Sequence, residues 1–161
     1  MCGIAGMLLS RRNSVSPVAL KKMTDAIRHR GPDGEGRFID GPCGLGHRRL
    51  AIIDLSPAGN QPMATADGRY VLTYNGEIYN FNELRIELET FGYRFHTKTD
   101  SEVVLNSIAH WGVSAFQRFN GIFALALWDR SKRTLLLARD RNPAIAYDAS
   151  NIFPPEPALW G

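Results

Sequence analysis

The chain has 161 residues, of which 44% are hydrophobic and 22% are charged, so it can form one domain with a packed core and a hydrated surface. Its 19 basic and 16 acidic residues give a formal charge of +3, and no basic run extends beyond a pair. This pattern argues against nucleic-acid binding, which calls for a continuous basic stripe. The sequence has no apolar stretch near the roughly 20 residues of a membrane span and no signal-peptide pattern at its start.

The two cysteines, Cys2 and Cys43, are too few for a disulfide framework, and no cluster of cysteine and histidine has the spacing of a zinc site. We therefore expect a reduced, cytoplasmic protein without a metal site. The segment around Cys43 is similar to a G-x-C-x-G nucleophile turn, but Leu45 stands where the second glycine belongs, and no His-x-Glu pair follows. We interpret Cys43 as a structural residue.

Apolar periodicity and turn residues predict the first elements in chain order. Residues 4–9 form a buried strand, and Ser16 caps a helix with Pro17 at its first position. The apolar face of this helix consists of Leu20, Met23 and Ile27. A turn rich in glycine and proline follows at 29–34, and short strands are then expected at 36–39, 44–49, 50–53 and 69–74.

Two helices and a hairpin complete the predicted domain. A capping box of Asn80 and Glu83 begins the second helix, which ends at Gly92 and buries Phe81, Leu84, Leu88 and Phe91. The third helix begins at Thr99 or Asp100. Strands at 122–128 and 134–138 form a hairpin that is apolar on both faces. This order predicts an α+β fold with two packed, mainly antiparallel β-sheets flanked by helices.

Cys2 has the chemistry of a nucleophile that carries its own base. Removal of Met1, which is common before a small second residue, would leave cysteine at the terminus with a free α-amine. An α-amine has a pKa of roughly 7.7–8.0, against ~10.4 for lysine, so near pH 7 it can accept the thiol proton directly or through water. The alternative is that Cys2 is a small core residue at the start of a strand.

Asn75 and Gly76 follow the strand predicted at 69–74. One interpretation is a hairpin turn, for which Asn-Gly is the commonest two-residue signal. No strand follows, however, because residues 77–79 lead directly into the helix capped by Asn80. The side-chain amide of Asn75 and the N–H of Gly76 would instead provide two neighbouring donors for the oxyanion of an acyl-transfer reaction.

Two arginines and an aspartate are candidates for binding a zwitterionic substrate. Arg48 and Arg49 face opposite sides if they lie in a strand, so at most one of them enters a given site. A guanidinium can bind a carboxylate with two hydrogen bonds, and the carboxylate of Asp100 could bind an ammonium group. The alternatives are a solvated arginine at a strand edge and a simple helix cap at Asp100.

Taken together, these segments resemble the glutaminase domain of class II, N-terminal-nucleophile glutamine amidotransferases, in particular that of asparagine synthetases. The matching segments lie in the order of that family and cover residues 1 to about 141: they are 1–6, 29–34, 46–54, 74–80, 99–102, 123–129 and 138–141. The resemblance implies an αββα sandwich of the N-terminal-nucleophile hydrolase type. It also implies that glutamine is hydrolysed to glutamate and ammonia through a thioester on Cys2, without a metal or cofactor.

The resemblance implies a role for each site residue. Cys2 would be the nucleophile, and Asn75 and Gly76 would form the oxyanion hole. Arg49, rather than Arg48, matches the arginine that binds the substrate carboxylate. The substrate ammonium would be held by Asp100 with help from Glu77. The backbone of four consecutive residues would line the pocket, namely Leu50, Ala51, Ile52 and Ile53.

The sequence departs from the family pattern after residue 141. The family is expected to continue with Leu-Gly-x-x-Pro-Leu-Tyr-Tyr and an ATP-using synthetase domain, whereas this sequence continues Asn-Pro-Ala-Ile-Ala-Tyr without a Ser-Gly-Gly motif. We therefore expect a glutaminase domain at 1–141, an irregular tail at 142–161 and no synthetase domain. ATP and Mg²⁺ would belong to that missing domain, and a synthetase domain or subunit would receive the ammonia.

Three hypotheses about function remain open at this point. The first is a glutaminase half-enzyme, the second is a non-catalytic or unstable remnant that retains a glutamine pocket, and the third is hydrolysis of another amide by the same residues. In each case the strand at 134–138 would lack its next neighbour. An open apolar edge of this kind predicts self-association.

Overall fold

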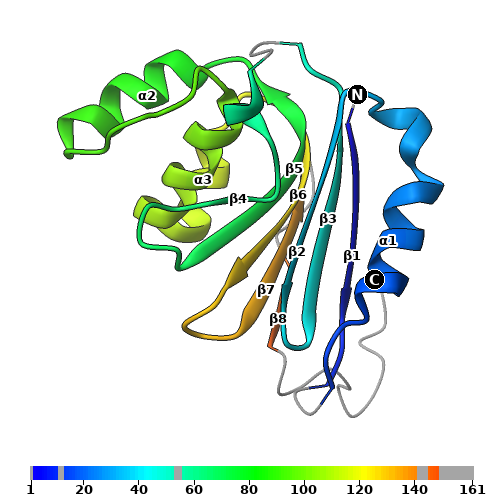
Figure 1. Cartoon of the computed structure of the whole chain (residues 1–161). Helices are drawn as coiled ribbons and strands as arrows, with labels where there is room; N and C mark the ends of the chain where they lie inside the picture. The colour runs from blue at the N-terminus through cyan, green and yellow to red at the C-terminus, as the bar shows by residue number, and fades with distance from the viewer. Residues whose placement is uncertain (1, 11–12, 53–55, 141–144, 149–161) are drawn as a thin grey trace, which may run out of the picture.

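The computed structural model describes residues 2–10, 13–52, 56–140 and 145–148. Figure 1 shows two β-sheets stacked face to face, with helices on the outer face of each. Helix α1 (Pro17–Ala26) covers one sheet, and helices α2 (Phe81–Thr90) and α3 (Asp100–Trp111) cover the other. The predicted α+β sandwich with helices outside is therefore confirmed.

The sheet under α1 has three antiparallel strands in the order β1-β3-β2. Strand β1 spans Gly3–Leu8, β2 spans Gly34–Asp40 and β3 spans Cys43–Arg49. Every residue of the central strand β3 is buried, because β3 has a strand on each side and packed layers above and below. Hence any polar side chain on β3 must find a partner inside the protein.

The second sheet has five antiparallel strands in the order β4-β5-β6-β7-β8. Their bounds are Met63–Ala64, Tyr70–Ile78, Gly121–Asp129, Thr134–Arg139 and Ile145–Asp148. Strand β4 pairs with Val71 and Leu72, so among the described residues β5 has no neighbouring strand on that side from residue 73 onward. This short β4 leaves one edge of β5 open near the space between the sheets.

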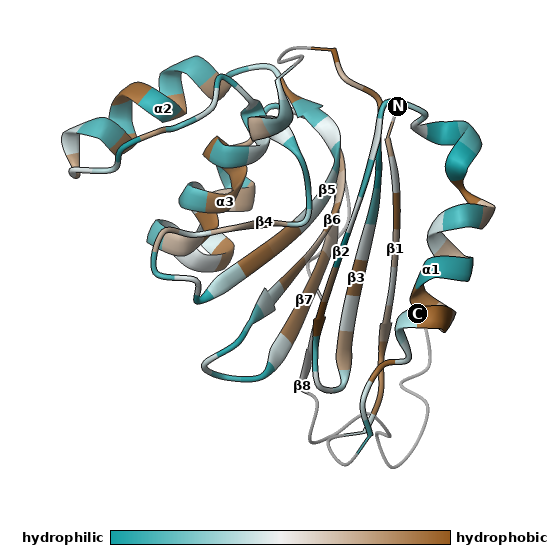
Figure 2. Ribbon diagram, in the orientation of Figure 1, coloured by the Kyte–Doolittle hydropathy of each residue, from teal (hydrophilic) through white to brown (hydrophobic). Residues whose placement is uncertain are grey.

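The second sheet is buried on both faces, as its apolar sequence predicted. Alternate residues of β5 point to opposite sides, so that Val71 joins an inter-sheet cluster with Cys43, Leu45 and Trp128. Leu72, Tyr74 and Ile78 pack instead against α2 and α3. Figure 2 shows the resulting concentration of hydrophobic residues in β5, β6, β7 and α3.

The helix starts confirm two of the three predicted caps. Ser16 accepts a hydrogen bond from Ala19 N at 3.4 Å, and Thr99 accepts one from Glu102 N at 3.3 Å, so Thr99 rather than Asp100 caps α3. The capping box at Asn80 is wrong. Its amide donates to Arg118 O and accepts from Asn120 N, because the chain returning from η3 (Gly112–Gln117) packs beside it. The predicted helix end at Gly92 is confirmed, but the predicted burial of Phe91 is wrong, because its side chain is 54% exposed.

Three expectations about strands need correction. Residues 50–52 form no strand, because β3 ends at Arg49, and Ile53 lies outside the described residues. Strand β5 continues to Ile78, so Asn75 and Gly76 lie within it rather than after it. The predicted irregular tail contains β8, which pairs with Thr134–Leu137 of β7 where we expected an open edge; residues 149–161 lie outside the described part.

One turn and one hairpin lie close to where the sequence predicted them. The turn predicted at 29–34 overlaps the short helix η1 (Arg28–Arg30), and β6 and β7 form the predicted hairpin. Among the described residues, none of the helices has both the length and the apolar character needed to cross a membrane.

Candidate active site

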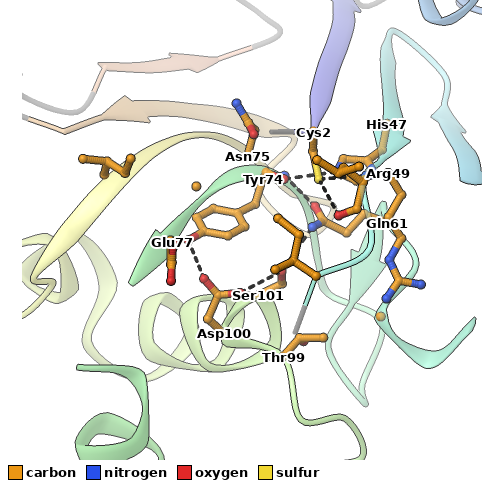
Figure 3. A pocket seen from close by; sticks show the side chains of 15 residues that line it. Cys2, His47, Arg49, Gln61, Tyr74, Asn75, Glu77, Thr99, Asp100 and Ser101 are labelled. Atoms are coloured by element: carbon orange, nitrogen blue, oxygen red, sulfur yellow. Dashed lines mark hydrogen bonds between the residues drawn. The ribbon is translucent and has the colours of Figure 1, made fainter. Parts of the chain in front are cut away.

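A cavity of about 120 Å³ lies where the N-terminal end of β1, the C-terminal end of β3, the open edge of β5 and the start of α3 meet (Figure 3). Most of the residues singled out in the sequence line it, although Ala51 does not and Ile53 is outside the described residues. The lining residues are Cys2, His47, Arg49, Leu50, Ile52, Gly59, Gln61, Tyr74, Asn75, Gly76, Glu77, Thr99, Asp100, Ser101 and Ile122.

Cys2 is held at one end of this cavity by backbone contacts. The N–H of Leu50 donates a hydrogen bond to the Cys2 sulfur at 3.3 Å, and the same sulfur lies 3.6 Å from the carbonyl oxygen of Leu50. The side chain of Arg30 donates to the Cys2 carbonyl at 3.1 Å. Because β1 pairs with β3, with Gly3 opposite Arg48, the thiol is placed on the face of this sheet that looks toward β5. It is half-buried, so it is reachable from the cavity.

The open edge of β5 carries three backbone N–H groups that face the cavity side. In an antiparallel strand, the N–H groups of alternate residues point to the same edge. Tyr74 N donates to the side-chain oxygen of Gln61 at 2.6 Å, and Ile78 N donates to the carboxylate of Asp100 at 3.1 Å. Gly76 lies between them, so its N–H points the same way. It has no acceptor within the described part of the chain.

The residue pairing on the opposite edge agrees with this assignment. Gly76 lies across from Phe123, whose carbonyl accepts from Asp140 N on the far side of β6. The pair is therefore the non-hydrogen-bonded type, in which the two strands approach most closely. A side chain at position 76 would overlap the carbonyl oxygen of Ile122 and lie 2.7 Å from Phe123 Cα. Glycine is thus required here by packing, and the hairpin interpretation of Asn-Gly is wrong.

The side chain of Asn75 shares the inter-sheet face of β5. Thr73, two residues earlier, donates from its hydroxyl to Gly46 O of β3. The face of β5 that carries Thr73 and Asn75 therefore looks toward the first sheet. Asn75 therefore projects toward the sheet that carries Cys2, and Figure 3 shows the two residues close together at the same end of the cavity. An amide side chain and the open N–H of the next residue therefore line the same cavity as the thiol.

The two consecutive arginines are separated by the alternation of β3. Arg48 points away from the cavity, where it forms ion pairs of 2.6 Å with Asp25 and with Glu35. Arg49 lines the cavity, and its guanidinium donates to Ser56 O at 2.6 Å and to the Asn60 side chain at 3.0 Å. The structure therefore places Arg49, not Arg48, where a substrate carboxylate could be bound.

Asp100 is buried at the opposite end of the cavity from Cys2 (Figure 3). Its carboxylate accepts from the hydroxyl of Tyr74 at 2.8 Å and from Ile78 N, so it does not serve as the helix cap. Burial raises the pKa of Asp100, against the opposing effect of these hydrogen bonds. Burial, followed by the nearby Asp100 charge, raises the pKa of Tyr74, which keeps its hydroxyl a donor. Glu77 also lines the cavity.

Sequence reasoning missed two residues that organise the site, His47 and Gln61. His47 is 1% exposed and its Nε2 lies 3.2 Å from the carbonyl oxygen of Tyr74. Burial lowers the pKa of His47 to about 4, so its ring is neutral near pH 7. Gln61 is also buried, and its amide donates to Ser101 Oγ at 3.1 Å. Both residues contact partners distant in sequence, and Gln61 lies in a Gly- and Pro-containing stretch that indicated only a turn.

This sandwich, with a thiol at the second residue and an open backbone donor in the same cavity, defines the N-terminal-nucleophile class of amidotransferase fold. The chain belongs to the glutamine amidotransferase domain family, which it matches over residues 1–145. It is 41% identical over 145 residues to glutamine-hydrolyzing asparagine synthetase 1 of Bacillus subtilis, a match that covers 87% of this chain and 22% of that protein. It is also 38% identical over 153 residues to amidase chry2 of Gibberella zeae, covering 88% of this chain and 23% of that protein.

Solved structures agree on the fold. A glutamine phosphoribosylpyrophosphate amidotransferase of Bacillus subtilis superimposes with a TM-score of 0.69 at 18% identity, covering 89% of this chain and 38% of that one. An allosteric regulatory enzyme of purine biosynthesis gives a TM-score of 0.71 at 19% identity, covering 88% of this chain and 38% of that one. This chain thus spans less than a quarter of the length of the two sequence relatives described above.

Proposed function

We propose that this chain hydrolyses glutamine to glutamate and ammonia through a thioester on Cys2. The observation that carries the proposal is the arrangement along one cavity. The thiol and the Asn75 amide lie at one end and Asp100 at the other, while Arg49 and the open Gly76 N–H line the cavity between them. An amide to be cleaved and the zwitterionic head of an amino acid would be bound at these different places.

The proposed reaction begins with removal of Met1, which gives Cys2 a free α-amine. The amine accepts the thiol proton, and the sulfur attacks the carboxamide carbon of glutamine. The resulting oxyanion accepts hydrogen bonds from the Asn75 amide and the Gly76 N–H. The C–N bond then breaks, the nitrogen takes up the proton and leaves as ammonia, and a thioester remains. Water attacks the thioester by the same route, which releases glutamate and restores the thiol.

Charge complementarity would select the substrate. The Arg49 guanidinium is held in a fixed orientation by Ser56 O and the Asn60 side chain, which suits bidentate binding of a carboxylate. The carboxylates of Asp100 and Glu77 would receive the substrate ammonium, and Leu50 and Ile52 would contact its aliphatic part. The proposed steps use only a thiol, an amine and water, so they require no metal or cofactor.

The ammonia would be used elsewhere. By analogy with the asparagine synthetases it resembles, we propose that this domain is the ammonia-supplying half of an asparagine-synthetase-like enzyme. A synthetase domain or subunit would then receive the ammonia, and ATP and Mg²⁺ would act there rather than at the cavity described above. Assay of asparagine formation with and without such a partner would test this part separately.

The hydrolysis proposal is tested by a glutamine analogue that carries an electrophilic ketone in place of the carboxamide. Intact-mass measurement and peptide mapping should show one label on Cys2 in a chain that lacks Met1, and glutamine should protect against labelling. The matching analogue of asparagine, one methylene shorter, serves as the control and should react much more slowly. A chain that binds glutamine but shows neither labelling nor ammonia release would instead be the non-catalytic remnant.

A further inference from the structure

The open edge of β5 is completed by side chains instead of a strand. Beyond Leu72 this edge has no strand neighbour in the described part of the chain, yet both backbone groups of Tyr74 are bonded. Its N–H donates to the Gln61 side-chain oxygen at 2.6 Å, and its carbonyl lies 3.2 Å from His47 Nε2. Because a carbonyl oxygen only accepts, Nε2 carries the ring proton and donates. Two buried side chains therefore occupy the positions that a neighbouring strand would fill.

The backbones that carry these two side chains are packed against neighbouring strands. His47 lies in the middle of β3, paired with Ile4 of β1 and with Gly36 of β2. A side chain at Gly36 would overlap the carbonyl oxygen of Gln61, so the Gln61 backbone packs directly against β2. The Gln61 amide also donates to Ser101 Oγ on α3. The Tyr74 peptide groups are thus tied to both sheets and to α3.

The next peptide group on this edge is the open N–H of Gly76. Within a strand, the direction of one edge N–H is set by the local twist, which the bonded groups on either side fix. Tyr74 is bonded to Gln61 and His47 on one side of Gly76, and Ile78 is bonded to Asp100 on the other. Gly76 lacks a side chain that could restrict its own backbone. Its orientation therefore depends on these neighbouring contacts.

We infer that Gln61 and His47 are positioning residues for glutamine hydrolysis, because they hold the Tyr74 peptide groups and so keep the Gly76 N–H directed at the oxygen of the amide that Cys2 attacks. This inference rests on the proposed function. It assigns to these residues no contact with the substrate and no proton transfer. Their effect lies in the transition state, where an oxyanion donor has to be in place without reorganisation.

Matched pairs of variants test the inference. His47→Leu removes the donor, whereas His47→Gln keeps an N–H near the position of Nε2; Gln61→Met removes the acceptor, whereas Gln61→Glu keeps it. The Leu and Met variants should lose about 10- to 100-fold in kcat for glutamine hydrolysis, the size of effect expected from misplacing a catalytic group by about an ångström. Their KM for glutamine should change little, and the Gln and Glu variants should recover most of the rate.

A second readout separates positioning from general damage to the site. Alkylation of Cys2 by iodoacetamide requires the thiol but no oxyanion hole, so its rate should be the same in the parent and in folded Leu and Met variants. If the parent hydrolyses glutamine and both variants keep its kcat, the inference is overturned. A parallel loss of alkylation and turnover would overturn it as well, because the damage would then reach Cys2 itself.

Failure of the proposed function gives a different pattern. In that case the parent neither releases ammonia nor reacts with the electrophilic glutamine analogue. The positioning of the Gly76 N–H by Gln61 and His47 is then tested directly, by NMR of the backbone amides in the isotopically labelled chain. Faster amide exchange at Tyr74 and a shifted Gly76 amide resonance in Gln61→Met, with recovery in Gln61→Glu, would support it. Unchanged exchange and resonances would overturn it, and Gln61→Met provides this test even if His47→Leu fails to fold.

Discussion

The two cysteines lie at opposite ends of one pair of strands, and their surroundings differ completely. Strands β1 and β3 are antiparallel, with Leu8 opposite Cys43 at one end and Gly3 opposite Arg48 at the other. Cys43 is 0% exposed, and burial raises its pKa to about 12, so it remains an unreactive thiol. Cys2 is half-buried, contacts backbone groups of Leu50 and opens into the cavity.

This comparison shows that the position in the sandwich, and not the residue type, separates structural from chemical cysteines. At the Cys43 end, the sheets meet through Leu45, Val71 and Trp128, which pack in one apolar cluster with the buried thiol. At the Cys2 end, the short β4 leaves polar backbone groups of β5 uncovered. A nucleophile needs access and nearby donors, and the Cys2 end provides both.

The largest expected effect is the difference in turnover between variants that lack one thiol or the other. Cys2→Ala should lower glutamine hydrolysis by at least roughly 10³-fold, because the covalent route is lost. Binding of glutamine, measured by calorimetry, should persist because Arg49 and Asp100 remain. Cys43→Ala should keep the parent turnover and lose roughly 1–2 kcal/mol of stability through the cavity it leaves. Turnover of Cys2→Ala within tenfold of the parent would remove Cys2 from the chemistry.

Blocking the α-amine should be nearly as damaging as losing the thiol. A chain with an N-terminal tag keeps the Cys2 thiol, but the α-amine becomes part of a peptide bond, so the proposed base is absent. Ammonia release should therefore fall to near the level of Cys2→Ala. Proteolytic removal of the tag to leave Cys2 first should restore it. An active tagged protein would show that another group accepts the thiol proton.

A smaller effect is expected when the two consecutive arginines are replaced one at a time. Arg49→Lys should raise KM for glutamine roughly 10- to 100-fold with a smaller change in kcat, because lysine keeps the charge but loses the two-pronged geometry. Arg48→Lys alters a residue that pairs with Asp25 and Glu35 outside the cavity, so its KM should match the parent. Steady-state kinetics on both variants would show which arginine binds the substrate carboxylate. The assignment fails if Arg48→Lys shows the larger KM change.

The smallest predicted effect concerns pH and His47. Burial lowers the pKa of His47 from 6.5 to about 4, so the unfolded chain takes up the proton first as pH falls. Stability should therefore decrease from about pH 6.5 towards pH 4, by roughly 2 kcal/mol between pH 7 and 5. The raised pKa of Asp100 acts in the opposite direction in acid. The difference in unfolding free energy between parent and His47→Gln isolates the histidine, because Asp100 is common to both. A difference that stays constant over this range would contradict the prediction.

The site was predictable wherever local sequence carries the chemistry. Cys2, Asn75, Gly76, Arg49 and Asp100 were all singled out, and the structure brings them to one cavity. Residue patterns left the choice between Arg48 and Arg49 open, and the family resemblance favoured the second. The capping interpretation of Asp100 was excluded by tertiary contacts, because its carboxylate binds Tyr74 and Ile78 N while Thr99 caps the helix.

Periodicity and turn residues alone determined the fold class, the helix start at Pro17, the start of the third helix at Thr99 or Asp100, and the hairpin of β6 and β7, because these depend on neighbours within a few positions. Tertiary structure alone decided that β5 runs on through Gly76, that β8 pairs with β7 and that Gln61 and His47 bind the Tyr74 peptide groups. These contacts join residues 13 and 27 positions apart. Their partners are chosen by how the two sheets stack, which no local pattern encodes.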